Sequence, residues 1–522
     1  MLAAFFDIMY SMNLRKESLT RAAFVILVAT FASRVLGFVR EILIAHFFGA
    51  RAVTDSYLVA TILPSTLAGL VSGALTTVFI SLFIEEREKH GEEKAWEGAR
   101  VVLRASLVYL VAATFVSYLL LPYFVRAIAP GFQGERLALS LSMGYLMMPS
   151  LVFLGLLGLF TGIMNAYQVF TLPALAGLLY NTCLISFLWW ARSYPVVGLS
   201  LGHMLGVLGQ FLILFFALRK RKPFGGRWSF SHPILVRTWK LMLPILVGTG
   251  VGYLNLIVDR IFASLLPVGT ITALNFAFRV REIPTGLFGS AIGQAVYPST
   301  SLKVTRGKIE ELRDLFSRSL EGLLLFILPA TVGLLIIPRE TIQILFERGA
   351  FDPHATGVTA QALFFYALGL PASASLQIVG QVFYAFQDTA TPVKVGVMGL
   401  AMNIALNALL VRSMAHRGLA LATSLSAIFI FLVLFETLRR RLGGIGGREL
   451  LRNLKKIALA TVCMAAFLFL LRPYARGWAG YLGVVGATAV FYGVLILFLR
   501  PRSGEKVVEV GKKLAGFLLR RK

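Results

Sequence analysis

The stretch AYQVFTLPALAG at residues 166–177 recurs in altered form as AFQDTATPVKVG at residues 385–396. Alanine, an aromatic residue, glutamine, proline and glycine keep the same spacing in both copies, which lie 219 residues apart. A second match, at an offset of 220 residues, pairs Pro64, Gly69 and Gly73 with Pro284, Gly289 and Gly293. Either match alone could arise by chance, but two matches at nearly one offset indicate an internal repeat.

Apolar runs of membrane-spanning length surround both copies. The 522 residues are 57% hydrophobic and 15% charged, with a mean hydropathy of +0.78. A helix needs about 20 apolar residues to cross a bilayer, and the sequence lacks the alternation of a membrane β-barrel. It therefore predicts an all-α polytopic membrane protein with 14 transmembrane helices, at 22–48, 54–84, 101–125, 137–164, 171–191, 196–218, 238–265, 270–301, 315–337, 356–386, 391–411, 418–438, 454–472 and 478–499.

The repeat predicts how these spans are grouped. About six spans separate equivalent positions, so helices 1–6 and 7–12 form two related six-helix lobes, which commonly enclose a central cavity. Helices 13 and 14 are an addition, and the short charged segment 339–352 is expected to lie at the membrane surface. The expected divisions are an N-terminal lobe at 1–218, a basic linker at 219–237, a C-terminal lobe at 238–441, and helices 13–14 with a basic tail at 442–522.

The charges of the loops predict how the chain is oriented in the membrane. Connections after odd-numbered helices contain few basic residues, whereas those after even-numbered helices, such as 219–240, 303–313 and 439–456, are rich in them. The inside-positive bias of membrane proteins therefore predicts that both termini are cytoplasmic. This bias also accounts for the net charge of +26, so we expect no nucleic-acid partner. The apolar start MLAAFFDIMY (1–10) lacks a basic leader and a cleavage site, and we do not expect it to be a signal peptide.

Three charged residues interrupt the first span, in the stretch SRVLGFVREILIA at 33–45. Arg34 and Glu41 are seven residues apart and share a face of the helix, with Arg40 on an adjacent face and Gly37 leaving room between them. An ionisable residue inside a span costs about 2.5–3.5 kcal/mol unless it is paired or hydrated, so such residues are functional candidates. Asp55 opens the second span and is a further candidate.

The eighth span carries a second charged group, FRVREIP at 278–284. Arg279 and Glu282 are three residues apart and can face each other, with Arg281 nearby. Pro284 is expected to kink or end the helix just after them.

The balance of these charges predicts the substrate. The positions expected to face the cavity contain more arginines than glutamates: Arg34, Arg40, Arg279 and Arg281 against Glu41 and Glu282. A surplus of guanidinium groups favours an anionic, phosphorylated substrate. The alternative is that the charges only pair helices together or extend to the membrane surface, and this interpretation is stronger for Asp55 and Arg260.

A second polar set consists of Asp259, Asn403, Asn407 and Thr423, in spans 7, 11 and 12. Oxygen ligands from three helices could hold a hard cation such as sodium. The alternative is ordinary hydrogen bonding between membrane helices, which asparagine and threonine commonly provide.

The sequence gives little support for catalytic or metal-dependent activity. It contains no HExxH, GxSxG or P-loop motif, and its six histidines are not clustered, so we expect no enzyme and no cofactor. Cys183 and Cys463, the two cysteines, lie in apolar segments and form no CxxC motif.

Three longer stretches identify a family resemblance. SRVLGFVREILIAHFFGARAVTDSYLVATILP (33–64), FRVREIPTGLFGSAIGQAVYPS (278–299) and FYAFQDTATPVKVG (383–396) resemble the MurJ/MviN family of lipid II flippases, in the multidrug/oligosaccharidyl-lipid/polysaccharide exporter superfamily. The resemblance covers essentially the whole chain, including helices 13 and 14. It implies a flippase in the bacterial inner membrane that moves the undecaprenyl-diphosphate-linked peptidoglycan precursor to the outer leaflet.

The resemblance also assigns roles to residues. It implies that Arg34, Arg40 and Arg279 line a cationic cavity, that Glu41, Asp55 and Glu282 are acidic partners, and that helices 13–14 form a groove for the polyprenyl tail. Some relatives carry another arginine in helix 2, where this chain has Ala68 and Gly69, and Arg281 is the candidate replacement. The family also includes members that resemble sodium-coupled transporters, with the coupling site in helices 7, 11 and 12. The resemblance therefore supports a sodium site at Asp259, Asn403, Asn407 and Thr423.

Alternative functions follow from the same fold or from the loops. The chain could flip another polyprenyl-diphosphate-linked oligosaccharide, or export cationic drugs, although the arginine surplus argues against drugs. It could also be a membrane scaffold that recruits partners through its basic loops, which would leave the charges in the spans unexplained. We expect a monomer that contacts lipid II and membrane lipids.

Overall fold

The computed structural model describes residues 19–221, 223–225 and 232–502. Over these ranges the chain forms helices and no β-strand, which confirms the predicted fold class. The predictions for the first ten residues, for part of the linker at 219–237 and for the tail beyond residue 502 lie outside the described residues.

Two compact units make up the described chain. Unit 1 contains residues up to Ile271 together with Arg348–Phe351, and unit 2 contains Thr272–Glu347 and the chain from Asp352 onward. This division assigns the seventh predicted span to unit 1, whereas the repeat assigns it to the C-terminal lobe. The lobe boundaries drawn from the repeat remain a prediction.

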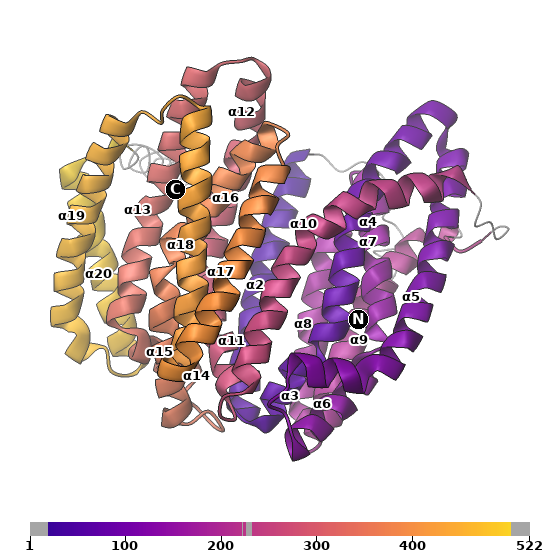
Figure 1. Cartoon of the computed structure of the whole chain (residues 1–522), viewed down its shortest axis with the longest axis horizontal. Coiled ribbons are helices and arrows are strands. Elements are labelled where there is room, and N and C mark those ends of the chain that lie inside the picture. The colour runs from indigo at the N-terminus through magenta and orange to yellow at the C-terminus, as the bar shows by residue number, and fades with distance from the viewer. Residues whose placement is uncertain (1–18, 222, 226–231, 503–522) are drawn as a thin grey trace, which may run out of the picture. The chain divides into compact units, whose positions relative to one another are not determined.

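The helices of unit 1 follow the first seven predicted spans (Figure 1). They are α2 (Leu19–Phe48), α3 (Ala52–Ala60), α4 (Ile62–His90), α5 (Glu92–Ile128), α6 (Gly134–Met147), α7 (Ser150–Ala166), α8 (Thr171–Ala191), α9 (Pro195–Leu218) and α10 (Pro233–Ser264).

The helices of unit 2 follow the remaining predicted spans. They are α11 (Thr270–Pro284, whose first two residues belong to unit 1), the π-helical turn η2 (Thr285–Gly289), α12 (Ser290–Thr305), α13 (Ile309–Ile336), α14 (Pro338–Phe346), α15 (Pro353–Leu368), α16 (Leu370–Ala385), α17 (Ala390–Met414), α18 (His416–Arg441), α19 (Gly447–Leu471) and α20 (Gly477–Leu499). The regular α-helix stops at Pro284, where a break was expected. The nine residues of α14 are too few to cross a bilayer.

Length and composition support fewer spans than the sequence predicts. Among the described residues, nine helices are long and apolar enough to cross a membrane, or up to twelve if each sharply bent pair is one span. The two predicted spans outside this set are α2 and α11–α12, which contain the charged stretches 33–45 and 278–284. The predicted total of fourteen is therefore not confirmed.

The internal repeat has the same backbone structure in both copies. Gln168 and Gln387, 219 residues apart, have left-handed φ angles of 58° and 59°. Each donates its backbone N–H at 2.9 Å to the carbonyl oxygen three residues earlier, in Asn165 and Tyr384 respectively. The next helix then begins three residues after each glutamine, so equivalent sequence forms an equivalent helix–turn–helix connection in each unit.

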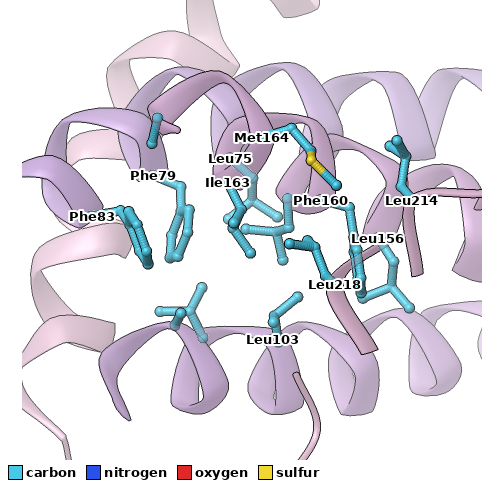
Figure 2. Close-up of a cluster of buried hydrophobic side chains, with 14 of the residues drawn as sticks. Leu75, Phe79, Phe83, Leu103, Leu156, Phe160, Ile163, Met164, Leu214 and Leu218 are labelled. Carbon is cyan, nitrogen blue, oxygen red and sulfur yellow. The ribbon is translucent and has the colours of Figure 1, made fainter. Parts of the chain in front are cut away.

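Aromatic and aliphatic packing forms the core of unit 1 (Figure 2). Side chains of α4, α5, α7 and α9 meet there, among them Phe79, Leu103, Phe160 and Leu214. At Gly158 a Cβ atom would lie 2.1 Å from Ser72 Oγ, so α7 can approach α4 this closely only with glycine. This packing fixes the positions of α4, α7 and α9, which together with α8 also line a polar pocket.

The repeated turn predicts an unusual sensitivity to β-branched residues. We expect Gln168→Val and Gln387→Val each to destabilise the protein by about 1–3 kcal/mol, because valine is strained at positive φ. Glycine at either position should not destabilise the turn. Thermal unfolding of the purified protein in detergent measures both effects.

Gln133 provides a matched control, because its φ of −132° is extended backbone that valine adopts readily. If Gln133→Val lowers the unfolding temperature as much as the two turn substitutions do, the left-handed turn is not the cause.

Candidate functional site

Arg40 of α2 contacts Glu41, Asn181 and Tyr180. Its Nη2 lies 2.6 Å from Glu41 Oε1, and its Nη1 donates to Asn181 Oδ1 of α8 at 3.1 Å. The guanidinium carbon lies 5.5 Å from the centre of the Tyr180 ring, within the range of a cation–π contact. The Arg40 side chain is 15% exposed, so this pairing is largely buried.

Gly177 allows α8 to approach α2 closely at this site. A Cβ atom at Gly177 would lie only 3.1 Å from Ser33 Oγ, whereas one at Gly37 would lie at an ordinary contact distance of 3.6 Å from the Asn181 amide oxygen. Asn181 Nδ2 donates to the carbonyl oxygens of Ser33 and Gly177 at 3.2 and 3.1 Å. The Asn181 amide is therefore fixed by backbone groups of both helices, and its oxygen is directed at Arg40.

Asn181 and Tyr180 were not among the predicted site residues. The signal available in the sequence was an asparagine within the apolar span 171–191, but nothing in its spacing indicated that its partner was Arg40. Arg34, the other predicted arginine of α2, lies in an exposed position six residues before Arg40.

Asp55 has a different setting from the arginines. It is 1% exposed, and its Oδ2 accepts the backbone N–H of Gly269 at 2.6 Å. Gly269 has a φ of +88°, and a Cβ there would lie 2.3 Å from the Ala50 carbonyl oxygen. Arg260, the other residue for which a structural role was expected, donates to the Ile271 carbonyl oxygen at 3.1 Å. Both contacts fix the connection between α10 and α11.

In unit 2, Arg281 is the buried arginine of α11, whereas Arg279 is exposed. Arg281 Nη1 lies 2.8 Å from Glu282 Oε1, its Nη2 donates to Ser373 Oγ of α16, and its guanidinium carbon lies 5.3 Å from the centre of the Phe278 ring. The ion pair that Glu282 shows is thus with Arg281, its neighbour in the chain, rather than with the predicted partner Arg279.

The predicted cation ligands are divided between the units. Asp259 belongs to α10 of unit 1, and the others belong to α17 and α18 of unit 2. Asn403 and Asn407 are fully buried, and the Asn407 amide donates to Asn403 Oδ1 at 2.9 Å. The Thr423 hydroxyl donates to the Leu419 carbonyl oxygen at 3.0 Å, which leaves its lone pairs available. In the described part of the chain, no group of three or more histidine, cysteine, aspartate or glutamate side chains could hold a metal ion.

An apolar pocket of about 1050 Å³ lies within unit 2, among α11, α13, α14, α19 and α20. Leu325, Phe326, Leu468 and Ile496 are among its lining side chains. Its few polar groups include Thr341 and Tyr481, whose hydroxyls lie 3.1 Å apart and bond to each other. The pocket therefore presents hydrocarbon to whatever occupies it.

These features define a polytopic helical membrane protein with paired charges in two of its helices, and solved transporters share its fold. A structure described as "Lipid II flippase MurJ, inward closed conformation" superposes with a TM-score of 0.80 over 93% of this chain and all of that chain, at 23% identity. A "multidrug resistance MATE family transporter of the MOP superfamily", in an inward-facing conformation, gives a TM-score of 0.66 over 81% of this chain and 98% of that one, at 15% identity.

Sequence comparison identifies the family. The family model described as "Lipid II flippase MurJ" matches residues 44–484. A "Probable lipid II flippase MurJ" from Rhizobium tropici is 30% identical over 483 residues, which is 90% of each chain. The chain belongs to the MurJ family of lipid II flippases.

The contact between Asp55 and Gly269 predicts a loss of stability on substitution. Asp55→Ala leaves the Gly269 N–H buried without its acceptor, and we expect a destabilisation of about 1–3 kcal/mol. Asp55→Asn keeps an oxygen acceptor and should cost less. Thermal unfolding in detergent distinguishes them, and an Asp55→Ala protein as stable as the parent would contradict the structural role.

Proposed function

We propose that this protein is a lipid II flippase, which binds the undecaprenyl-diphosphate-linked peptidoglycan precursor at the inner leaflet and releases it at the outer leaflet. The observation that carries the proposal is the Arg40 site, where an arginine side chain that is 15% exposed is paired with a single carboxylate. Membership of the MurJ family, and the relatives named as lipid II flippases, support the choice of substrate.

The diphosphate of the substrate would bind to Arg34, Arg40 and Arg279. A guanidinium donates two parallel hydrogen bonds to phosphate oxygens, and such charge-assisted bonds are stronger than neutral ones. Glu41 would neutralise Arg40 in the absence of substrate, and Asn181 would keep its guanidinium oriented when phosphate takes the place of Glu41. Arg281, already bonded to Ser373 and Glu282, would position α11 rather than supply another free guanidinium.

The apolar pocket of unit 2 would hold part of the polyprenyl tail. Its hydrocarbon lining and its location among α13, α14, α19 and α20 support this assignment. A tail in this pocket would remain in an apolar environment while the polar headgroup crosses the membrane.

Transport would occur by alternating access of two lobes around a central cavity. An inside-negative potential contributes about 2.3 kcal/mol per charge per 100 mV, which favours an empty cationic cavity facing inward and opposes outward movement of an anion. Sodium bound by Asp259, Asn403, Asn407 and Thr423 would offset that cost, since those residues offer carboxylate, amide and hydroxyl oxygens.

The remaining assignments follow from the same proposal. The protein would act as a monomer in the bacterial inner membrane with both termini cytoplasmic, and it would transport lipid II without chemical change rather than act as an enzyme. Export of cationic drugs is disfavoured, because the arginine groups would repel them.

Arg40 provides the test in cells. We expect Arg40→Ala to weaken diphosphate binding about 10- to 100-fold, the loss typical of hydrogen bonds to charged groups, and to abolish flipping. Arg40→Lys should have an intermediate effect because it keeps the charge but loses the forked geometry. The measurement is growth and lipid II translocation in a flippase-depleted strain, repeated with sodium and pH varied.

Arg192, in the loop after α8, is a matched control for loss of a positive charge away from the site. The assigned role of Arg40 would be refuted if the depleted strain grows normally when it carries the Arg40→Ala variant, with that variant present at the same level as Arg192→Ala.

A further inference from the structure

We propose that a polar, uncharged pocket within unit 1 binds the sugar that is bonded directly to the diphosphate of the substrate. This inference rests on the proposed function, because it assigns a further part of the same substrate to a second site. The pocket encloses about 300 Å³ among α4, α7, α8 and α9. Half of its ten lining residues have polar side chains: Ser65, Ser72, Tyr180, His203 and Gln210.

Two of these polar side chains form the fixed wall of the pocket. His203 Nδ1 lies 3.0 Å from the Tyr180 hydroxyl, and His203 Nε2 lies 3.4 Å from Ser150 Oγ. His203 is 4% exposed and Ser150 is fully buried. Both ring nitrogens of His203 therefore have partners, and these contacts hold the Tyr180 side chain in place.

The other three polar side chains are available to a ligand. Within the described part of the chain, Ser65, Ser72 and Gln210 make no side-chain hydrogen bond. All three residues are only half-buried, and their polar atoms are accessible to a ligand that enters the pocket. Two hydroxyls and an amide supply both donors and acceptors, the combination that matches the hydroxyl and acetamido groups of a sugar.

The chemistry of the lining excludes other parts of the substrate. None of the ten lining residues is aspartate, glutamate, lysine or arginine, so nothing there neutralises a phosphate or a charged peptide. Small-molecule pockets commonly enclose about 300–1,000 Å³, and a pocket at the lower limit has room for one sugar unit. Ala68 contributes a small side chain to the α4 wall of the pocket.

The position of the pocket agrees with the order of groups in the substrate. Tyr180 lines the pocket, and its ring also lies against the Arg40 guanidinium. The next residue, Asn181, bonds to Arg40 directly. A phosphate on Arg40 would thus be separated from the pocket by one tyrosine side chain, and in a diphosphate-linked saccharide the first sugar is the group bonded to that phosphate.

Two substitutions test the pocket by different means. Ala68→Leu fills it, and Gln210→Leu removes an amide at nearly constant volume. Binding to the full-length protein in detergent is measured with undecaprenyl diphosphate and with lipid II, which carries the sugars and peptide on the same lipid. We expect each substitution to weaken lipid II binding about five- to tenfold and to leave undecaprenyl diphosphate binding unchanged, since only the sugar contacts are lost.

Thr77→Val is the matched control, because Thr77 lies on α4 like Ala68, but its side chain is exposed and does not line the pocket. Retained binding of undecaprenyl diphosphate shows that a variant is folded, and Gln210→Leu carries the test if Ala68→Leu does not fold. The proposal is overturned if the substitutions weaken both lipids equally or affect neither.

Arg40→Ala separates this inference from the proposed function. Loss of both lipids in Arg40→Ala supports the diphosphate site whatever the pocket variants do. Unchanged binding of undecaprenyl diphosphate to Arg40→Ala overturns the diphosphate site, even if the pocket variants bind lipid II more weakly.

Discussion

A guanidinium that is largely buried in a helical membrane protein must be paired, and this requirement shapes the contact between α2 and α8 in unit 1. Arg40 would be expensive to insert alone, and Glu41 neutralises its charge without satisfying all of its donors. Asn181 contributes a further acceptor, and its own amide is fixed by carbonyl oxygens of both α2 and α8. The close contact of these two helices at Gly177 is therefore tied to the pairing of one charge.

Some of the charged residues stabilise the fold, whereas others can bind a ligand. Asp55 is buried and accepts the N–H of Gly269, and Arg281 is buried between Glu282 and Ser373. A substrate would have to break those contacts to use either group. Arg40 differs in exposure, because its side chain is 15% exposed whereas that of Arg281 is 5% exposed.

Much of the architecture could be predicted from the sequence, because hydropathy and spacing are local properties. The stretches 166–177 and 385–396 form the same left-handed glutamine turn, as expected of a true repeat. The predicted span count was not confirmed, because α2 and α11–α12 are not among the described helices that are long and apolar enough to cross a membrane. The partners of the charged residues were harder to predict. Asp55 bonds to a backbone group 214 residues away, and the pocket combines serine and glutamine residues that are unremarkable individually.

The central claim is tested most directly by translocation in a defined membrane. The purified protein is reconstituted into liposomes that contain labelled lipid II, and the fraction reaching the opposite leaflet is followed with time. The account predicts translocation much faster than in protein-free liposomes, and a return to the protein-free rate with Arg40→Ala. A folded protein that binds lipid II yet moves it no faster than protein-free liposomes would contradict the account.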